Sequence, residues 1–195
     1  MWRNCNAPVF FIGAFLFVNE KLTYDPRMGT ITIATRRAGP QDASGIAAVH
    51  GESWRNAYTG IVPHAALNRM ITRRGADWWE NAIRRATIVL IVEIGGVIAG
   101  YATLGRNRVG TLPYDGEIYE LYMRPEYQGI GVGSRLFLAA RAELKRRGLK
   151  GSVVWVLAEN HPAIRFYENA GGKAVAEGHE AFDGTQLAKI AYSWD

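Results

Sequence analysis

Periodic apolar positions divide the chain after residue 30 into short strands and helices. Residues 31–36 alternate β-forming and polar side chains, which predicts a strand. The apolar run 88–104 is interrupted by Gly95-Gly96, and a glycine pair between two β-rich arms predicts two antiparallel strands joined by a hairpin turn. Further strands are expected over residues 117–123, 153–158, 173–176 and 187–194.

Helical spacing of apolar residues fills the segments between these strands. Leu136, Phe137, Ala140 and Leu144 recur at the interval that buries one helix face, and Gly148 follows as a stop signal. Further helices are expected over residues 42–58, 65–71, 76–85 and 160–169. Because no linker or repeat interrupts this order, the pattern predicts one mixed domain with a hairpin-rich sheet and interleaved helices.

Residues 1–29 are interpreted as an N-terminal extension of a domain that spans residues 30–195. The apolar run 9–18 is shorter than the roughly 20 residues that a membrane-spanning helix needs. Residues 19–23 lack the small-residue pattern of a signal-peptide cleavage site. Three interpretations stay open: sequence upstream of a true start at Met28, an added packing element, or a membrane-targeting segment. A shorter protein that starts at Met28 is our working hypothesis.

Composition limits the classes of function. With 48% hydrophobic residues, a chain of 195 residues can bury a core, which excludes disorder for most of its length. The net charge of +5 favours an anionic partner, although the basic groups Arg84-Arg85 and 145–147 fall on predicted helices as solvated faces. The single cysteine, Cys5, excludes an intramolecular disulfide and a multi-cysteine metal site, and it fits a cytoplasmic protein. The histidines show no ligand spacing, so no metal is expected.

A glycine-rich turn between a strand and a helix carries the clearest chemical signal. Gly129, Gly131 and Gly133 alternate with apolar residues just before the predicted helix. A helix start presents unpaired amides and a partial positive charge, so this turn predicts a phosphate-binding loop. The dinucleotide fingerprint requires a third glycine where Ser134 stands, and the Gly-Lys-Ser/Thr of a Walker A loop is absent. Neither of those nucleotide-binding motifs fits.

Two motifs together resemble the GCN5-related N-acetyltransferase (GNAT) superfamily, in its bacterial form. Gln128, Gly131 and Gly133 match the family's Gln/Arg-x-x-Gly-x-Gly/Ala loop, which holds the pyrophosphate of acetyl-CoA. Downstream, the family's Asn-x-x-Ala-x-x-Phe-Tyr-x-x-x-Gly segment is matched by Asn160, Ala163, Phe166, Tyr167 and Gly171. The resemblance covers about residues 31–195 and implies a mixed, mostly antiparallel sheet of about six to seven strands flanked by helices.

The resemblance also implies roles for the matched positions. Backbone groups of the strand segment Leu121, Tyr122 and Met123 would pair with the pantetheine arm of acetyl-CoA like an additional strand. Asn160 and Phe166 would lie on the cofactor, and the Tyr167 hydroxyl would protonate the leaving thiolate as general acid. The pyrophosphate would be held by the amides of Gln128, Gly129, Ile130, Gly131, Val132, Gly133 and Ser134. Arg135 and Arg165 are candidates for further phosphate contacts.

Each of these assignments has a purely structural alternative. The loop glycines could serve only close packing, Asn160 could cap the following helix, and Tyr167 could be a core aromatic residue. A neutral amine must attack the thioester, so a general base is expected, and Glu117 and Glu120 precede the loop. Because side chains alternate along a strand, the two glutamates are expected to face opposite sides. Glu117 is preferred because several family members carry a glutamate base there.

The acceptor is the part of the reaction that the motifs leave open. Trp54 and Tyr58, four residues apart on a predicted helix, are candidates for the wall of the substrate pocket or for the core. The predicted activity is transfer of an acetyl group from acetyl-CoA to a primary amine of a small molecule or a protein, by direct attack. The alternative is a catalytically inactive domain that binds acyl-CoA as a sensor or scaffold. Nucleic acid and membrane partners are not expected, and a homodimer is common in the family.

Overall fold

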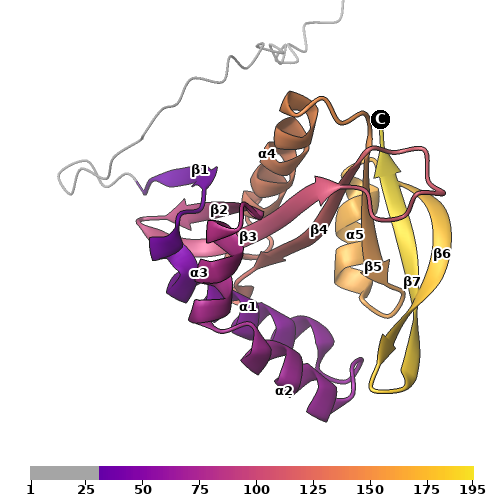
Figure 1. Cartoon of the computed structure of the whole chain (residues 1–195), viewed down its shortest axis with the longest axis horizontal. Helices are drawn as coiled ribbons and strands as arrows, with labels where there is room; N and C mark the ends of the chain where they lie inside the picture. The colour runs from indigo at the N-terminus through magenta and orange to yellow at the C-terminus, as the bar shows by residue number, and fades with distance from the viewer. Residues whose placement is uncertain (1–30) are drawn as a thin grey trace, which may run out of the picture.

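The structure is a computed structural model and describes residues 31–195. This part of the chain is built around a seven-stranded sheet (Figure 1). The strands lie in the order β1-β2-β3-β4-β5-β7-β6, and every neighbouring pair except β4 and β5 is antiparallel. The strands are β1 (Ile33–Arg37), β2 (Ile88–Ile94), β3 (Val97–Arg106), β4 (Gly116–Met123), β5 (Ser152–Leu157), β6 (Lys173–Phe182) and β7 (Thr185–Trp194). The mixed, mostly antiparallel sheet that the GNAT resemblance implies is therefore confirmed.

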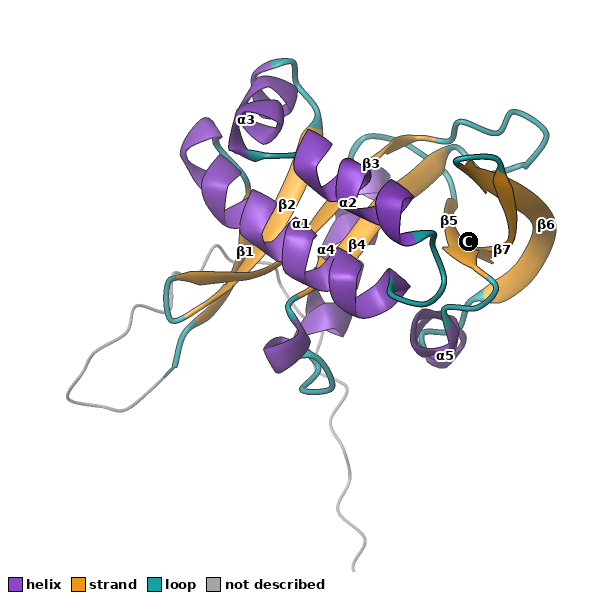
Figure 2. Cartoon of the chain, turned by 90° about the horizontal axis from the view of Figure 1, so that it is seen from below, coloured by secondary structure: helices purple, strands orange, loops and turns teal. Residues whose placement is uncertain are grey.

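Helices cover both faces of this sheet (Figure 2). The helices are α1 (Ala43–Tyr58), α2 (His64–Arg73), α3 (Ala76–Arg84), α4 (Val132–Arg146) and α5 (His161–Asn169), with short 3-10 turns at Pro40–Asp42 and Pro125–Tyr127. Helices α1, α2 and α3 lie on one face, which we call the front face, and α4 and α5 lie on the other, the back face. The apolar stripe of α4 is buried as its spacing predicts, through Leu136, Phe137, Ala140 and Leu144.

The turn residues decide where strands reverse. Gly95 and Gly96 both adopt positive φ angles and join β2 to β3, as the glycine pair predicts. The C-terminal strands are longer than expected, because Asp183-Gly184 forms a second two-residue turn with positive φ angles. This turn produces one continuous β6–β7 hairpin where the sequence pattern predicted two short strands. Asp-Gly is a strong hairpin signal that the sequence interpretation missed.

One interruption of the sheet, between β4 and β5, shapes the region next to the glycine loop. The parallel pairing of β4 and β5 is limited to Gly116 with Ser152 and Glu117 with Val153. Beyond this point β4 pairs only with β3 and β5 pairs only with β7, so the backbone of β4 from residue 118 to 123 has no strand on its β5 side. The sheet therefore opens into a gap that leads towards the start of α4.

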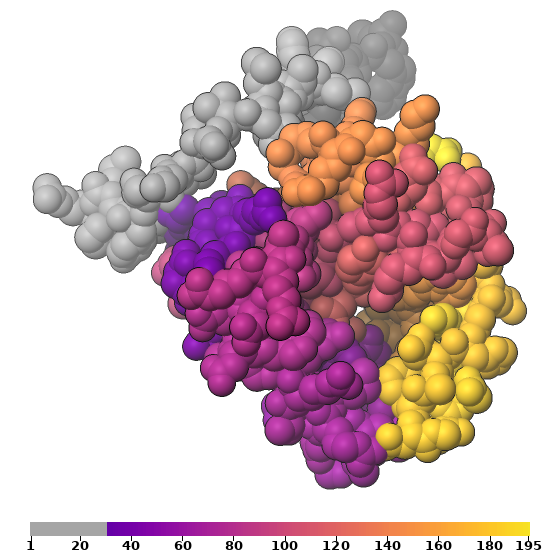
Figure 3. Space-filling model, in the orientation of Figure 1, coloured from indigo at the N-terminus to yellow at the C-terminus, as the bar shows by residue number. Residues whose placement is uncertain are grey.

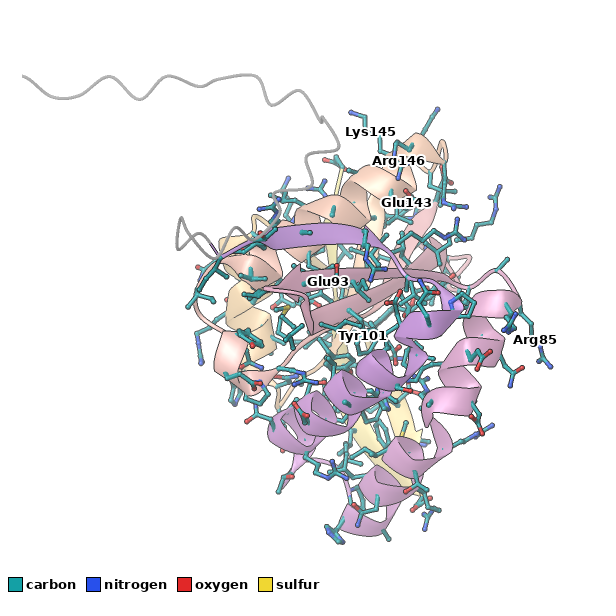
Figure 4. The ribbon with its side chains drawn as sticks, turned by 90° about the vertical axis from the view of Figure 1, so that its left-hand side faces the viewer. Arg85, Glu93, Tyr101, Glu143, Lys145 and Arg146 are labelled. Atoms are coloured by element: carbon teal, nitrogen blue, oxygen red, sulfur yellow. The ribbon has the colours of Figure 1, made fainter. Side chains whose placement is uncertain are left out.

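The predicted solvated basic groups lie on the surface. Figure 4 shows Arg85, Lys145 and Arg146 pointing outward from the helical layers, while Tyr101 lies inside the molecule. None of the helices within residues 31–195 is long and apolar enough to span a lipid bilayer. The interpretations of residues 1–29 lie outside the described residues.

Candidate active site

The glycine loop begins where β4 ends. The Gln128 side-chain amide donates a hydrogen bond to the carbonyl of Met123 (3.1 Å), which ties the loop to the last residue of the strand. Gly129 and Gly131 have φ angles of +77° and +85°, and a Cβ added at either position would meet only open space. These two glycines serve a left-handed backbone rather than close packing. Gly131 is the N-cap of α4, so the loop brings its backbone directly to the start of that helix.

The remaining loop residues leave the helix start accessible. Ile130 and Ser134 are exposed, while Val132 is buried against the core below α4. Gly133 lies inside the first turn, and a Cβ there would be in ordinary contact with Met123 and Phe166. The first turn thus presents its amides without bulky side chains in front of them, which is the local requirement for anion binding. Arg135 and Arg165 are both exposed on the helices α4 and α5.

Helix α5 brings the second motif to the same side of the sheet. The Asn160 side chain accepts a hydrogen bond from the Ala163 amide (3.3 Å), so Asn160 caps α5, as the structural alternative for this residue predicts. Phe166 packs edge-on against Phe137 of α4. Tyr167 is buried among aromatic residues of α4, β7 and α5, and its hydroxyl has no hydrogen-bond partner within residues 31–195. Burial raises the pKa of Tyr167, and the nearby Tyr58 hydroxyl raises it further.

The two glutamates lie on the same face of β4, which corrects the expectation that they face opposite sides. Glu120 pairs with Thr103 of β3, and Glu117 pairs with Gly105, two residues further along the same strand. Residues two apart on a regular strand share a face, so their partners on β4 share it too. Tyr119 is the extra residue of a β-bulge, and this insertion shifts the alternation of β4 by one position.

Glu117 is fully engaged at the closed end of the gap. Its carboxylate accepts a hydrogen bond from the Arg108 backbone amide (2.9 Å) and from the Arg108 guanidinium (2.5 Å). The side chain of Glu117 is only 1% exposed, whereas that of Arg108 is 64% exposed and lies over the Tyr119 ring. Glu117 therefore holds the loop between β3 and β4 in place, and its own pairing with Val153 is one of the two that join β4 to β5.

Glu120 lies further along β4, beside the open part of the gap. Its carboxylate forms an ion pair with Arg74, which follows the last residue of α2, and accepts a hydrogen bond from the Thr103 hydroxyl (3.3 Å). Arg74 also stacks on the rings of Trp54 and Trp78. A segment distant in sequence thus fixes the orientation of this carboxylate, and the Glu120 side chain keeps 11% of its surface exposed.

An aromatic cluster lies around Glu120 and extends towards Tyr167. Trp54 is buried, and Tyr58 donates to or accepts from the Tyr122 hydroxyl at 2.7 Å. Burial raises the pKa of both tyrosines, and the Glu120 carboxylate acts in the same direction. The Glu120 carboxylate raises the pKa of Tyr58, and Tyr58 in turn raises the pKa of Tyr167, so Tyr58 lies within electrostatic range of both residues. Trp54 is therefore a core residue, and Tyr58 packs against the same apolar cluster while only partly buried.

His50 and Tyr101 belong to this cluster but were missed by the sequence interpretation. The His50 Nδ1 atom lies 2.8 Å from the Tyr101 hydroxyl, and both residues are fully buried. Burial lowers the pKa of His50 to about 3, with the positive charge of Arg74 as the second cause. The His50 ring is therefore neutral at physiological pH. A histidine on an apolar helix stripe beside a tryptophan is a weak signal in the sequence, because only tertiary packing brings Tyr101 to it.

The geometry fits an extended, phosphorylated ligand. The β5 side of the backbone at residues 118–123, which has no strand partner, can take an additional strand-like segment, and the helix start at the end of that strand can take phosphate. Open space at Gly129 and Gly131 leaves the loop free of side chains where phosphate oxygens would approach. Within residues 31–195, no three His, Cys, Asp or Glu side chains gather closely enough to hold a metal ion.

Comparison with known proteins agrees with this geometry. The profile of the Acetyltransferase (GNAT) family matches residues 51–171. The uncharacterized N-acetyltransferase YuaI of Bacillus subtilis (strain 168) is 32% identical over 162 residues, covering 83% of this chain and 92% of that protein. The spermidine N(1)-acetyltransferase of Thermoplasma acidophilum is 25% identical over 144 residues, covering 73% and 89%.

A solved structure supports the same fold. The crystal structure of the PaiA N-acetyltransferase from Thermoplasma acidophilum in complex with coenzyme A superposes with a TM-score of 0.67 at 22% sequence identity. It covers 84% of this chain and 99% of its own. Together with the profile match over more than half of the sequence, these likenesses establish that the chain belongs to the GNAT family of acetyltransferases.

Proposed function

We propose that this protein transfers an acetyl group from acetyl-CoA to a primary amine by direct attack of the amine on the thioester. The observation that carries the proposal is the gap between β4 and β5, which runs along the part of β4 that carries Glu120 and leads to the glycine loop at the start of α4. Bound acetyl-CoA would supply an activated acetyl group. The only cysteine of the chain is Cys5, so residues 31–195 contain no thiol for an acyl-enzyme.

Three parts of the chain would hold the cofactor. The backbone of Leu121, Tyr122 and Met123 has no strand on its β5 side and would pair with the pantetheine arm. The amides of residues 128–134 would hold the pyrophosphate at the start of α4. Phe166 would contact the arm from α5, while Asn160 positions α5 through its cap.

Glu120 and Tyr167 take opposite ends of the proton transfer in this proposal. Glu120, directly or through water, removes a proton from the acceptor ammonium, so that the neutral nitrogen forms the new N–C bond. As the thioester C–S bond breaks, the Tyr167 hydroxyl gives its proton to the departing sulfur, and the second proton that the attacking nitrogen loses as the amide forms returns Tyr167 to its neutral form. Because burial raises its pKa, Tyr167 keeps this proton at neutral pH. Glu120 replaces Glu117 as the preferred base because the Glu117 side chain is 1% exposed and bound by both the amide and the guanidinium of Arg108, whereas Glu120, although paired with Arg74, keeps 11% of its side chain exposed beside the open part of the gap.

Tyr167→Phe and Glu120→Gln test the two roles, with Glu117→Gln as the matched control. We expect each of the first two substitutions to lower kcat by about 10²–10⁴-fold while the Kd for acetyl-CoA changes little. Steady-state acetylation and calorimetric titration with acetyl-CoA measure the two quantities. If both substitutions left kcat within a factor of two, the roles would be wrong. If acetyl-CoA bound but no amine of a broad panel were acetylated, the inactive sensor or scaffold would be the better description.

A further inference from the structure

The helices of the front face meet the proposed base at one residue, Arg74. Helix α1 packs against both α2 and α3, and the space-filling view shows α2 and α3 as one continuous surface beside the yellow β6–β7 hairpin (Figure 3). Arg74 and Gly75 are the two residues that join α2 to α3. The Arg74 side chain is 28% exposed and turns towards the sheet, where it forms an ion pair with Glu120 of β4.

Two tryptophan rings flank the Arg74 guanidinium. Its Cζ atom lies 5.9 Å from the centre of the Trp54 ring, on α1, and 4.9 Å from the centre of the Trp78 ring, on α3. Both distances lie within the range of a cation–π contact, and a planar guanidinium stacks well on aromatic faces. Trp54 is buried, and Trp78, although 38% exposed, lies edge-on against the fully buried Trp79. The guanidinium is therefore held in place from two separate helices.

The Glu120 carboxylate is held at both of its oxygens. Arg74 donates from Nη1 to Oε1, and the Thr103 hydroxyl of β3 donates to Oε2 at 3.3 Å. The contact with Arg74 joins two charged groups and belongs to the stronger class of hydrogen bonds. A carboxylate offers about four lone-pair sites, so each oxygen can still accept from a further donor, such as the acceptor ammonium or a water molecule. Arg74 and Thr103 thus orient the carboxylate without using up its capacity to accept a proton.

Packing alone does not explain this ion pair. The cost of removing two charges from water offsets much of their attraction, so apolar residues of similar size would stabilise such a site about as well. Nor is Trp78 needed to fill the core, because it keeps more than a third of its surface exposed. Both features are accounted for if the contact serves the carboxylate of Glu120.

We propose that Arg74 is the positioning residue of the base. Its guanidinium, held between Trp54 and Trp78, keeps the Glu120 carboxylate in the orientation that takes the proton from the acceptor ammonium. This inference rests on the proposed acetyl transfer, with Glu120 as the base, and adds the residue on which that base depends. Loss of the orientation should lower kcat about 10- to 100-fold, because a misplacement of about 1 Å in a catalytic group costs up to about 10²-fold.

A cycle of substitutions tests whether Arg74 acts through Glu120. Arg74→Ala should lower kcat about 10- to 100-fold and leave the Kd for acetyl-CoA within about a factor of two. Added to Glu120→Gln, which has no base left to orient, the same substitution should lower kcat no further. Arg73→Ala is the matched control, because it removes the same charge from the exposed neighbouring residue, and it should leave kcat unchanged.

Arg74→Lys keeps the cycle measurable if Arg74→Ala does not fold, which thermal unfolding of each variant monitors. Lysine retains the positive charge beside Glu120 but lacks the planar fork that fits between the two indole rings. We therefore expect Arg74→Lys to keep more of kcat than Arg74→Ala and still less than the parent protein. In the Glu120→Gln background it too should have no effect on kcat.

Free guanidinium gives a readout that a purely structural role would not move. Arg74→Ala is expected to leave a slot between the rings of Trp54 and Trp78 that this planar cation fits. Guanidinium chloride at up to about 50 mM, far below the molar range in which it unfolds proteins, should raise kcat of this variant several-fold. Sodium chloride at the same concentration should not, and neither salt should raise kcat when Glu120→Gln is also present. Without acetyl-CoA, the guanidinium titration should change tryptophan fluorescence saturably in Arg74→Ala and not in Arg73→Ala.

The outcomes separate this inference from the proposed function. It would be overturned alone by an Arg74→Ala variant with kcat within a factor of two of the parent, by an equal fall of kcat in the parent and in Glu120→Gln, or by a folded Arg74→Ala variant that guanidinium does not rescue. If Glu120→Gln kept the kcat of the parent, the base would be wrong and this inference with it, while acetyl transfer would stand. Transfer to no amine at all would overturn the proposed function as well.

Discussion

A negative charge placed at Gly131 should abolish cofactor binding while an identical change at Gly148 should not. Both glycines have positive φ angles, +85° and +74°, and a Cβ added at either would meet only open space. Forcing a non-glycine residue into this backbone region costs about 1–2 kcal/mol, so Gly131→Glu and Gly148→Glu should be destabilised equally. For a domain of this size each should lower Tm by about 2–8 °C.

The two variants differ in where the new carboxylate lies. Gly131 caps the start of α4, whereas Gly148 follows its C-terminal end. Opposite a pyrophosphate, a carboxylate about 4 Å away costs about 4 kcal/mol at an effective dielectric constant of 20, and solvent screening reduces this to about 1.4–3 kcal/mol. We therefore expect the Kd of acetyl-CoA to rise about 10- to 150-fold in Gly131→Glu.

Calorimetric titration with acetyl-CoA and thermal unfolding measure both effects on the same samples. Gly133→Ala provides a second control, because its Cβ would make only ordinary contacts, 3.5 Å from Met123 and 3.8 Å from Phe166, and alanine favours a helix. This variant should bind acetyl-CoA like the parent protein. An unchanged Kd in Gly131→Glu, or an equal loss in Gly148→Glu, would refute the assignment of the pyrophosphate to this helix start.

Three further predictions concern the surrounding structure. The pKa of His50 is about 3 in the folded protein and 6.5 ordinarily, so between these pH values the unfolded chain binds a proton at His50 that the folded protein does not. The free energy of unfolding should therefore fall as pH drops from about 6.5 to 3, by at most about 1.4 kcal/mol per pH unit. Denaturant titration should show this slope in the parent and a shallower one in His50→Phe; equal slopes would contradict it. Glu117→Gln should lower the free energy of unfolding by about 1–3 kcal/mol, because it removes the ion pair with Arg108; the loss is limited because the exposed Arg108 can turn to solvent. This substitution should leave kcat unchanged, and a large loss of kcat at full stability would show that Glu117 is the base. Gly100→Ala should lower Tm strongly, because the added Cβ would lie 2.7 Å from the Tyr122 carbonyl oxygen. An unchanged Tm would show that β3 and β4 can shift apart enough to accept the methyl group.

Local signals in the sequence predicted a large part of this protein. The Gly95-Gly96 turn, the apolar stripe of α4 and the glycine loop before it depend on residues within a few positions of one another, and the structure has them where the pattern indicates. The two motifs also led to the GNAT family, which the comparisons establish. Such features can be inferred from sequence because backbone conformation and one-sided burial are properties of short segments.

The arrangement of the candidate site depended on contacts between distant segments. Alternation along β4 alone places Glu117 and Glu120 on opposite faces, but the bulge at Tyr119 arises from pairing with β3 and puts both on one face. Arg74, 46 positions away in the chain, orients the Glu120 carboxylate, whereas the Glu117 carboxylate is bound by Arg108. Neither partner could be assigned from the sequence around the two glutamates. Strand register and ion-pair partners follow from tertiary packing, which a local sequence pattern does not encode.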